Sequence, residues 1–405
     1  MINVEEALEL VLECARAKTP KTVSLEQALG RVLAEEITSD IDSPPHDKSL
    51  VDGYAVLAAD AKVTPVELTV NEEVTAGETP SLPVTTGTAT RIMTGAPIPA
   101  GADAIVMVEQ TESVEGQAAD VRLAKQQVQG GQHIMRRATS LRRGEVVLSK
   151  GALVRPIEIG LLAEVGRPQV SVFPAPNVAV LSTGNELVPA GDAPGAGQIR
   201  NSNGPMLGAL VQRAGGRHID LGIGRDDQKS LSQLVGRGLE ADVLVLSGGV
   251  SAGVLDLVPG VLASLGVAQV FHKVDLKPGK PVWFGVLADP KGDKLVFGLP
   301  GNPVSSLVCF ELFVRPAMAR LAGGSADRLA TQSARLTNDH RHRGDRPTYF
   351  PARLRPVEGQ SQVELLAWKG SADLRTLSSA DCLAFFPKGE RAYHAGDEIE
   401  VILFP

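Results

Sequence analysis

The chain has 405 residues, a formal net charge of −7 and an aromatic content of 4%. At roughly 150 residues per domain, this length predicts two to four domains. The acidic balance and the scarcity of aromatic side chains argue against nucleic-acid binding and against docking on an anionic membrane. Three scattered cysteines, an acidic N-terminus and the lack of a long apolar run together predict a soluble cytoplasmic protein.

The first 43 residues are predicted to be largely helical. Asn3 followed by Glu6 resembles a capping box at the start of a helix with one apolar face. A second helix is expected from Ser24 to Leu33, with Gln27 as the capping partner of Ser24. These residues predict a small N-terminal region built mainly from two helices.

Between residues 44 and 136 the sequence pattern changes from helical to β-type. Short β-type runs, such as Val66–Val70 and Asp103–Val108, are separated by glycine and proline, which predicts a small β domain. Residues 137–174 contain a predicted helix from Ile157 to Val165 and are expected to return to the N-terminal region. The β domain is therefore read as an insertion.

From residue 175 to 326, strands and helices alternate. The expected strands are Val178–Leu181, Ile219–Ile223, Val243–Leu246 and Lys294–Phe297, and the expected helices are Gly204–Ala214, Leu231–Leu239, Val258–Leu265 and Val304–Leu321. This alternation predicts a parallel, doubly wound α/β sheet, in which ligands bind at the carboxyl ends of the strands.

Residues 330–405 read differently again. They carry strand-like runs at Thr348–Leu354, Val363–Leu366 and Ile399–Phe404, separated by glycine-rich turns. The segment is predicted to form a small β-barrel or sandwich.

Three glycine-rich turns lie close together in the α/β region, at Ser247–Asp256, Lys277–Pro281 and Gly298–Pro303. Backbone N–H groups between a strand and a helix form a natural anion site. Asn302 suits an N-cap and Pro303 the first helical position, so the amides behind them are expected to face a ligand. A single such turn is more often only a turn, but several at successive strand ends favour a binding site.

Charged residues accompany these strand ends. Glu186, Asp226 and Asp256 have the carboxylates that Mg²⁺ prefers. The alternative for Asp226 and its neighbour Asp227 is that they only cap a helix or face solvent. Three lysines, Lys273, Lys277 and Lys280, lie among apolar, proline and glycine residues, which favours a phosphate-binding role over a solvated charge run.

The basic stretch from Arg335 to Arg346 contains His340 and His342, and two alternatives remain for it. A solvated loop is the favoured interpretation, and a basic lip over the anion site is the other. No Ser-His-Asp arrangement is present to support nucleophilic catalysis.

On six motifs the chain resembles the MoeA family of molybdopterin molybdenumtransferases, over nearly its whole length. The motifs are Ser49–Ala55, Arg91–Pro97 with Gly101–Val106, Leu181–Leu187, Ser247–Ser251, Lys277–Pro281 and Gly298–Val304. Each motif alone is modest, whereas their order and spacing together are highly specific.

The resemblance implies an elongated subunit of four domains, at 1–43 plus 137–174, 44–136, 175–326 and 330–405. These would be a mixed domain, a β insertion domain, a doubly wound α/β molybdopterin-binding domain and a C-terminal β-barrel domain. It also implies a homodimer with the active site between subunits. The implied reaction converts adenylylated molybdopterin and molybdate to molybdenum cofactor and AMP with a divalent metal, here Mg²⁺. A molybdopterin adenylyltransferase would be a transient partner.

The same resemblance assigns roles to residues. Asp52 and Thr94 would come from the insertion domain and reach across the dimer, and Asp256 would be central to metal binding and catalysis, together with Glu186 and Asp226. The substrate would be contacted by Lys273, Lys277, Lys280, Ser247, Gly248, Gly249, Ser251, Pro300, Asn302 and Pro303, and molybdate by Arg346 and Ser371.

The sequence departs from the family pattern at three places. Asn185 stands where an aspartate is common, Thr139 and Ser140 where an acidic pair is usual, and Val254 where an acidic residue often occurs. The insertase is the leading hypothesis, and the alternative, which these departures would favour if they proved inactivating, is a gephyrin-like scaffold or a paralogue with reduced activity. A rival enzyme reading rests on the α/β region only and suggests an adenylyltransferase or a nucleotide pyrophosphatase, against which the two β domains argue.

Overall fold

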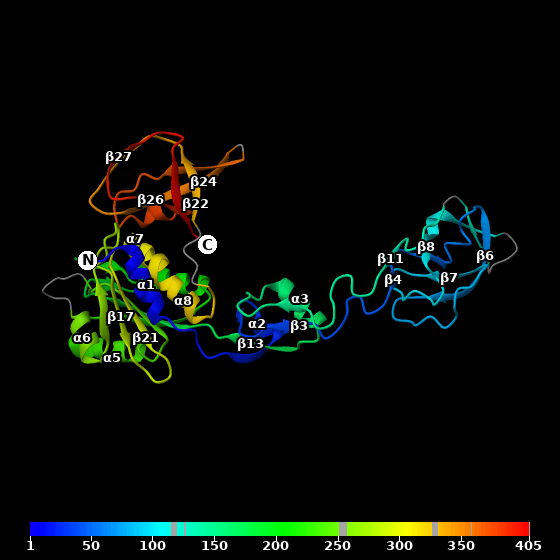
Figure 1. The fold of residues 1–405 in the computed structure, drawn as a ribbon. Helices are drawn as coiled ribbons and strands as arrows, with labels where there is room; N and C mark the ends of the chain where they lie inside the picture. Colours follow the sequence, from blue (N-terminus) through cyan, green and yellow to red (C-terminus); the bar gives the residue numbers. More distant parts are fainter. Residues whose placement is uncertain (115–119, 125–126, 251–256, 326–330, 358, 405) are drawn as a thin grey trace. The chain divides into compact units, whose positions relative to one another are not determined.

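The computed structural model describes residues 1–114, 120–124, 127–250, 257–325, 331–357 and 359–404, and it divides into two compact units (Figure 1). Unit 1 comprises residues 1–35, 151–156 and 169–405, and unit 2 comprises residues 36–150 and 157–168. The four predicted domain boundaries stay a prediction. None of the described helices is long and apolar enough to span a membrane.

The centre of unit 1 is a six-stranded sheet in the order β17-β14-β18-β21-β20-β19. Its strands are β14 (Asn177–Thr183), β17 (Arg217–Gly224), β18 (Val243–Ser247), β19 (Ala268–His272), β20 (Trp283–Leu287) and β21 (Lys294–Leu299). The first four in this order are parallel, and β18 is buried along its whole length. A strand that is covered on both faces reads as a continuous apolar run, as Val243–Leu246 does.

Helices cover both faces of this sheet. They are α1 (Val4–Cys14), α4 (Asn203–Arg213), α5 (Gln228–Gly238), α6 (Val258–Ser264) and a continuous helix of α7 (Pro303–Cys309), a π-helical turn (Phe310–Val314) and α8 (Arg315–Leu321). Val243 and Val245 of β18 pack in the cluster of α1, α4, α7 and α8, whereas Leu244 and Leu246 pack with α5 and α6. The doubly wound α/β prediction is confirmed.

The four predicted strands are parallel, as expected, but the sheet also contains β20, which runs antiparallel to both of its neighbours. Neither β19 nor β20 was expected, and the Lys277–Pro281 turn belongs to the connection between them. Since β19 and β21 are both antiparallel to β20, they point the same way, so the carboxyl ends of β18, β19 and β21 share one edge. All three glycine-rich turns therefore begin at the same edge of the sheet.

At the N-terminus, the first predicted helix is confirmed and the second is largely wrong. The side chain of Asn3 caps α1 by accepting a hydrogen bond from the Glu6 amide at 2.7 Å. The second helix, α2, covers only Leu25–Ala28, and Gly30 follows it with a left-handed φ of 72°, which ends a helix. Its neighbours are strands in the order β1-β13-β2, with bounds Lys21–Ser24, Gln169–Phe173 and Val32–Leu33.

The C-terminal part of unit 1 is a closed barrel in the order β22-β25-β24-β26-β28, as predicted. Its strands are β22 (Thr331–Leu336), β24 (Thr348–Val357), β25 (Gln360–Leu365), β26 (Cys382–Phe386) and β28 (Glu398–Leu403), with a ribbon of β23 (His340–Gly344) and β27 (Gly389–Tyr393) and a short helix α9 (Leu374–Leu377). Tyr349, Leu383 and Ile402 of this part are buried in the same cluster as α1 and α7. The barrel and the sheet region thus share one apolar core.

Unit 2 is built on a six-stranded sheet in the order β8-β5-β7-β6-β10-β9, which confirms the predicted β domain. The strands are β5 (Gly53–Val56), β6 (Val66–Val74), β7 (Thr88–Ile92), β8 (Ala104–Met107), β9 (Thr111–Ser113) and β10 (Asp120–Leu123), and a 3₁₀ turn covers Val108–Gln110. Smaller pairs are β4 (Lys48–Ser49) with β11 (Ile134–Met135) and β3 (Ile37–Thr38) with β12 (Val146–Leu148). The predicted helix at residues 157–165 is α3 (Pro156–Glu164).

Candidate functional site

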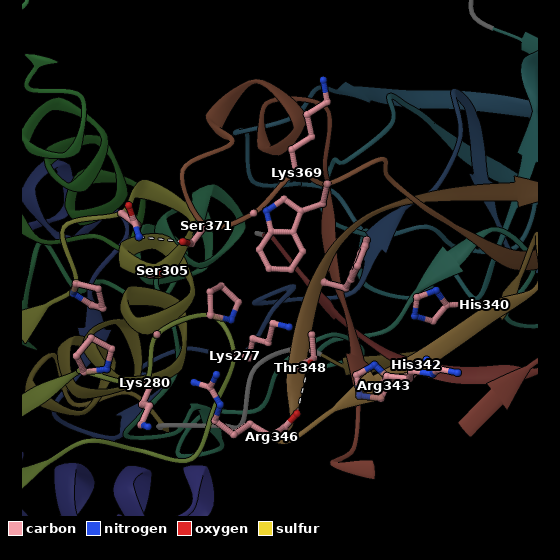
Figure 2. A pocket seen from close by; sticks show the side chains of 18 of the residues that line it. Lys277, Lys280, Ser305, His340, His342, Arg343, Arg346, Thr348, Lys369 and Ser371 are labelled. Carbon is pink, nitrogen blue, oxygen red and sulfur yellow. Dashed lines mark hydrogen bonds between the residues drawn. The ribbon is translucent and has the colours of Figure 1, made fainter. Parts of the chain in front are cut away.

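Two neighbouring pockets of unit 1 lie at the carboxyl edge of its sheet. The first, here called the cationic pocket, has a volume of about 740 Å³ and lies between the Lys277–Pro281 turn, the start of α7, strand β23 and the segment Trp368–Ser371 (Figure 2). The second, the acidic pocket, has a volume of about 550 Å³ and lies between the ends of β14, β17, β18 and β21. The short strands β15 (Leu187–Val188) and β16 (Ile199–Arg200) also contribute to the acidic pocket. The predicted convergence of the strand ends is therefore confirmed.

The cationic pocket is defined by charge. Its lining includes six basic side chains, Lys277, Lys280, Arg341, Arg343, Arg346 and Lys369, and none of its described lining residues is acidic. Arg346 is held in place, because its Nη1 donates to the Leu276 carbonyl and its Nε to the Asp345 carboxylate, both at 3.3 Å. This density of cations suits an anionic ligand.

Figure 2 shows how the walls of the cationic pocket face each other. On one side lie Ser305 and Ser371, on the other His340, His342 and Arg343, and between them Lys277 and Arg346. The pocket therefore combines side chains from the sheet region with side chains from the C-terminal part of the chain.

The histidines of β23 correct a prediction. A solvated loop was favoured for the stretch that contains them, but His340 and His342 are strand residues in the wall of the cationic pocket. Burial lowers the pKa of both rings, and the His340 ring and the Lys277 ammonium lower that of His342 further. Neutral histidines are therefore expected near pH 7, and the positive charge of the pocket comes from its lysines and arginines.

The acidic pocket contains the carboxylates of Glu186 and Asp226. Asp226 is positioned by Asn185, whose amide N–H donates to Oδ2 at 3.3 Å and whose side-chain oxygen accepts from the Asp226 amide at 3.1 Å. The neighbouring Asp227 caps α5 and accepts from the Ser230 amide at 2.8 Å. Each of the two alternatives therefore holds for one residue of the pair: Asp227 caps a helix, and Asp226 lines the pocket.

Of the three predicted magnesium ligands, the structure describes two, Glu186 and Asp226. No group of three or more His, Cys, Asp or Glu side chains that could hold a metal occurs among the described residues. Asp256, the third predicted ligand, and Ser251 lie outside the described residues. Glu186 and Asp226 nevertheless offer the oxygen donors that a hard cation prefers, so this pair fits Mg²⁺ chemically.

The two pockets meet at Asn302, which lines both. Its side-chain Nδ2 donates to the Ser371 hydroxyl at 2.9 Å, and the Val304 amide donates to the Ser371 carbonyl at 3.0 Å. Asn302 occupies the N-cap position of α7 but makes no capping hydrogen bond. The expectation that the amides behind Asn302 face a ligand is therefore wrong for Val304, because its amide already donates to the Ser371 carbonyl of the C-terminal part.

The remaining predicted substrate-binding residues are divided between the two pockets, except for Lys273. Ser247, Gly248, Gly249 and Pro303 line the acidic pocket and Pro300 the cationic pocket, but the Gly248 amide already donates to the Leu299 carbonyl at 3.0 Å. Lys273 lines neither pocket and has a left-handed φ of 71°.

Asp52 and Thr94 are brought together in unit 2. The Thr94 amide and hydroxyl donate to one Asp52 oxygen at 2.6 and 2.7 Å. These two hydrogen bonds, the backbone one first, lower the pKa of Asp52. The sequence alone gave no reason to expect this direct pairing.

Sequence reasoning missed several polar residues of the acidic pocket. Asn201 and Asn203 line its floor beside Ser182 and Thr183. The signal that could have revealed them is the Asn201-Ser202-Asn203 run, since polar residues of this type cluster at the start of a helix such as α4.

Comparison with known proteins covers the whole chain. Three family models match, described as "MoeA N-terminal region (domain I and II)" over residues 2–166, "Probable molybdopterin binding domain" over 179–320 and "MoeA C-terminal region (domain IV)" over 333–404. The chain is 33% identical to a molybdopterin molybdenumtransferase of Staphylococcus aureus, over 99% of this chain and 95% of that protein. It is 36% identical to molybdopterin molybdenumtransferase 2 of Mycobacterium tuberculosis, over 99% of each.

A solved structure agrees with these matches. The crystal structure of the molybdopterin biosynthesis MoeA protein of Pyrococcus horikoshii superimposes with a TM-score of 0.83 at 35% identity, covering 100% of this chain and 99% of that one. The resemblance seen in the motifs is thereby confirmed in sequence and in fold. The chain belongs to the MoeA family.

Proposed function

We propose that this chain is a molybdenum insertase, which converts adenylylated molybdopterin and molybdate to molybdenum cofactor and AMP. Its relatives are named molybdopterin molybdenumtransferases, and the likeness extends over nearly their full length. The single observation that carries the proposal is the meeting of a cationic and an acidic pocket at Asn302. An oxyanion needs cationic side chains, whereas the Mg²⁺ that accompanies a nucleotide needs carboxylates, and adjoining pockets of these two kinds support both requirements.

Molybdate is assigned to the cationic pocket. Lys277, Lys280 and Arg346 supply positive charge there, and Ser371 supplies a hydroxyl beside them. Side chains of this kind bind a tetrahedral dianion by charge-assisted hydrogen bonds. The pocket excludes acidic side chains among its described lining residues, which keeps the dianion from being repelled.

The nucleotide part of the substrate is assigned to the acidic pocket. Glu186 and Asp226, with Asp256 from the resemblance, would hold Mg²⁺, which offsets phosphate charge when the phosphoanhydride is cleaved. Ser247, Gly249 and Pro303 would position the phosphates from the strand ends. Lys273 is assigned no contact in either pocket.

The proposal also covers the oligomeric state and the cellular location. We propose a homodimer in which Asp52 and Thr94 serve the site of the partner subunit, and their mutual hydrogen bonds support a shared role. A cytoplasmic location is supported by three free cysteines. Transient contact with a molybdopterin adenylyltransferase follows from the nature of the substrate.

The two alternatives gain no support. Nothing in the comparisons favours a scaffold without activity, and Asn185, one of the family departures, is used to position Asp226. The reading limited to the α/β region leaves the matched segments on both of its sides unexplained.

The test is a turnover assay with adenylylated molybdopterin, molybdate and Mg²⁺, in which AMP release and cofactor formation are measured. Molybdate-stimulated AMP release is expected, and its absence would contradict the proposal. Asp226→Asn and Asp256→Asn should each lower turnover by at least tenfold. Asp227→Asn is the matched control, because Asp227 caps α5 and does not line the pocket. Asparagine caps a helix about as well as aspartate, so stability should change little and turnover should stay unchanged.

A further inference from the structure

Asn203 at the floor of the acidic pocket joins three elements of the site. It is the first residue of α4 and only 8% of its surface is exposed. Its Nδ2 donates to the Ser247 hydroxyl at 2.8 Å and to the Gly301 carbonyl at 2.7 Å. Ser247 is the last residue of β18 and Gly301 follows β21, so one side chain links the carboxyl ends of two neighbouring strands.

The orientation of the Asn203 amide is determined by its partners. A carbonyl oxygen can only accept a hydrogen bond, so the group 2.7 Å from the Gly301 carbonyl is the amide nitrogen. The same nitrogen therefore donates to Ser247. The amide oxygen has no hydrogen-bond partner among the described residues, although a buried acceptor without a donor costs about 1–3 kcal/mol.

This contact determines what the Ser247 hydroxyl can do. Because its oxygen accepts from Asn203, its hydrogen must point elsewhere, and Ser247 makes no other side-chain hydrogen bond with the residues that the structure describes. The two neighbouring hydroxyls differ. Ser182 donates to the Asn201 side chain at 3.0 Å, and Thr183 donates to the Ser247 carbonyl at 3.4 Å. Of these three hydroxyls in the pocket, Ser247 is the one with a hydrogen left for a ligand.

We infer that Asn203 is a positioning residue, which orients the Ser247 hydroxyl as a hydrogen-bond donor to a phosphate oxygen of the nucleotide part of the substrate. The identity of the ligand rests on the proposed function. The inference adds Asn203 to the site and states that the Ser247 hydroxyl donates, rather than accepts, the hydrogen bond to the ligand. An oxyanion accepts hydrogen bonds only, so a hydroxyl whose oxygen is already occupied is the form that it needs.

The experiment uses the full chain and AMP with Mg²⁺ as the probe, with binding measured by titration calorimetry. Asn203→Ala and Ser247→Ala are each expected to weaken AMP binding by about tenfold, the equivalent of one charge-assisted hydrogen bond. The double variant should bind no more weakly than Ser247→Ala, because Asn203 acts through that hydroxyl. The phosphorus NMR shift of bound AMP should move in the same way in both single variants.

Asn203→Asp is the sharper variant, since it keeps the shape of the side chain and reverses the hydrogen bond. A carboxylate accepts the Ser247 hydrogen and so removes it from the ligand, and AMP binding should weaken at least as much as in Asn203→Ala. This variant carries the test if circular dichroism shows that Asn203→Ala is unfolded. Asn71→Ala is the control: the Asn71 amide also donates to a carbonyl, that of Pro83 at 3.0 Å, but it lies in unit 2 and AMP binding should not change.

Additive losses in the double variant, or an unchanged affinity in Asn203→Asp, would overturn the inference and leave the proposed function intact. If the unaltered protein bound no AMP, both would fall.

Discussion

The side-chain amide of Asn302 lies 2.9 Å from the hydroxyl oxygen of Ser371, 69 positions later in the chain, and donates a hydrogen bond to it. Asn302 lines both pockets, whereas Ser371 lines only the cationic one. This hydrogen bond therefore marks the boundary at which the proposed oxyanion and nucleotide sites adjoin.

Asn302→Ala should lower molybdate-dependent AMP release by roughly five- to tenfold. The variant loses a hydrogen bond of about 1 kcal/mol, and Ser371 is then held less firmly beside the start of α7. The affinity for AMP should change little. Steady-state kinetics with calorimetry checks both. Asn338→Ala is the control, since this exposed residue bonds only to the Thr337 hydroxyl in the described structure. Equal kinetics for Asn302→Ala and the unaltered protein would contradict the role of this boundary.

Lys277→Ala should raise the KM for molybdate by about tenfold, since it removes one cation from a pocket that has no acidic lining residue in the described structure. The effect should diminish with added salt, because Lys277 is exposed. Lys291→Ala is matched in charge and exposure and precedes β21, at the opposite edge of the sheet, so its KM should not change. A Lys277→Ala variant with normal KM would remove this lysine from the oxyanion site.

Acidification should destabilise the region around β23. Burial holds the pKa of His340 and His342 below the ordinary 6.5, so the unfolded chain binds protons at a higher pH than the folded protein does. Their contribution to stability is complete above about pH 6.5 and is lost as the pH falls through the lowered folded-state pKa values. Urea unfolding at pH 7.5 and pH 5.5 measures the difference.

A double variant identifies the histidines responsible. His340→Leu with His342→Phe should reduce the pH dependence of the unfolding midpoint, whereas the exposed His394→Gln should keep it. The same pH dependence in the double variant and in the unaltered protein would show that other groups titrate in this range.

Thr94→Val should raise the pKa of Asp52 only part of the way toward the ordinary 3.8. The substitution removes the hydroxyl donor and leaves the backbone donor, which is the larger cause of the lowered pKa. A carboxyl titration followed by NMR checks this result. A pKa that returns fully to its ordinary value would mean that the backbone hydrogen bond is lost with the hydroxyl. Thr69→Val, in strand β6 of unit 2, is a suitable control.

The convergence of the strand ends could be predicted from the sequence, because Val178–Leu181 and Val243–Leu246 are unbroken apolar runs of the kind that a buried parallel strand requires. The hairpin of β19 and β20 could not. Its strands flank a Pro/Gly-rich turn, and residues 283–287 form a strand by pairing with both β19 and β21, which no local pattern reveals.

For β23 the sequence allowed two interpretations, a solvated loop and a basic lip over the anion site, and it could not decide between them. Alternating arginine and histidine is the pattern of a solvated strand or loop, and nothing local reveals that His342 packs on Phe386, with ring centroids 5.3 Å apart. The Asn302–Ser371 contact depends on tertiary structure in the same way. Local patterns determined which elements form, and long-range contacts determined which side chains share a pocket.

Because the barrel and the sheet region share one core, the barrel of one family member cannot simply be replaced by that of another. Tyr349 and Ile402 are packed with α1 and α7 rather than kept within the barrel. A shortened chain that ended at residue 325 would expose this apolar surface and would also leave the Val304 amide without the Ser371 carbonyl. A chimera that received its barrel from a relative would meet the same mismatch. The C-terminal barrel and the helices that it covers are therefore expected to have changed together during evolution, as one inherited piece.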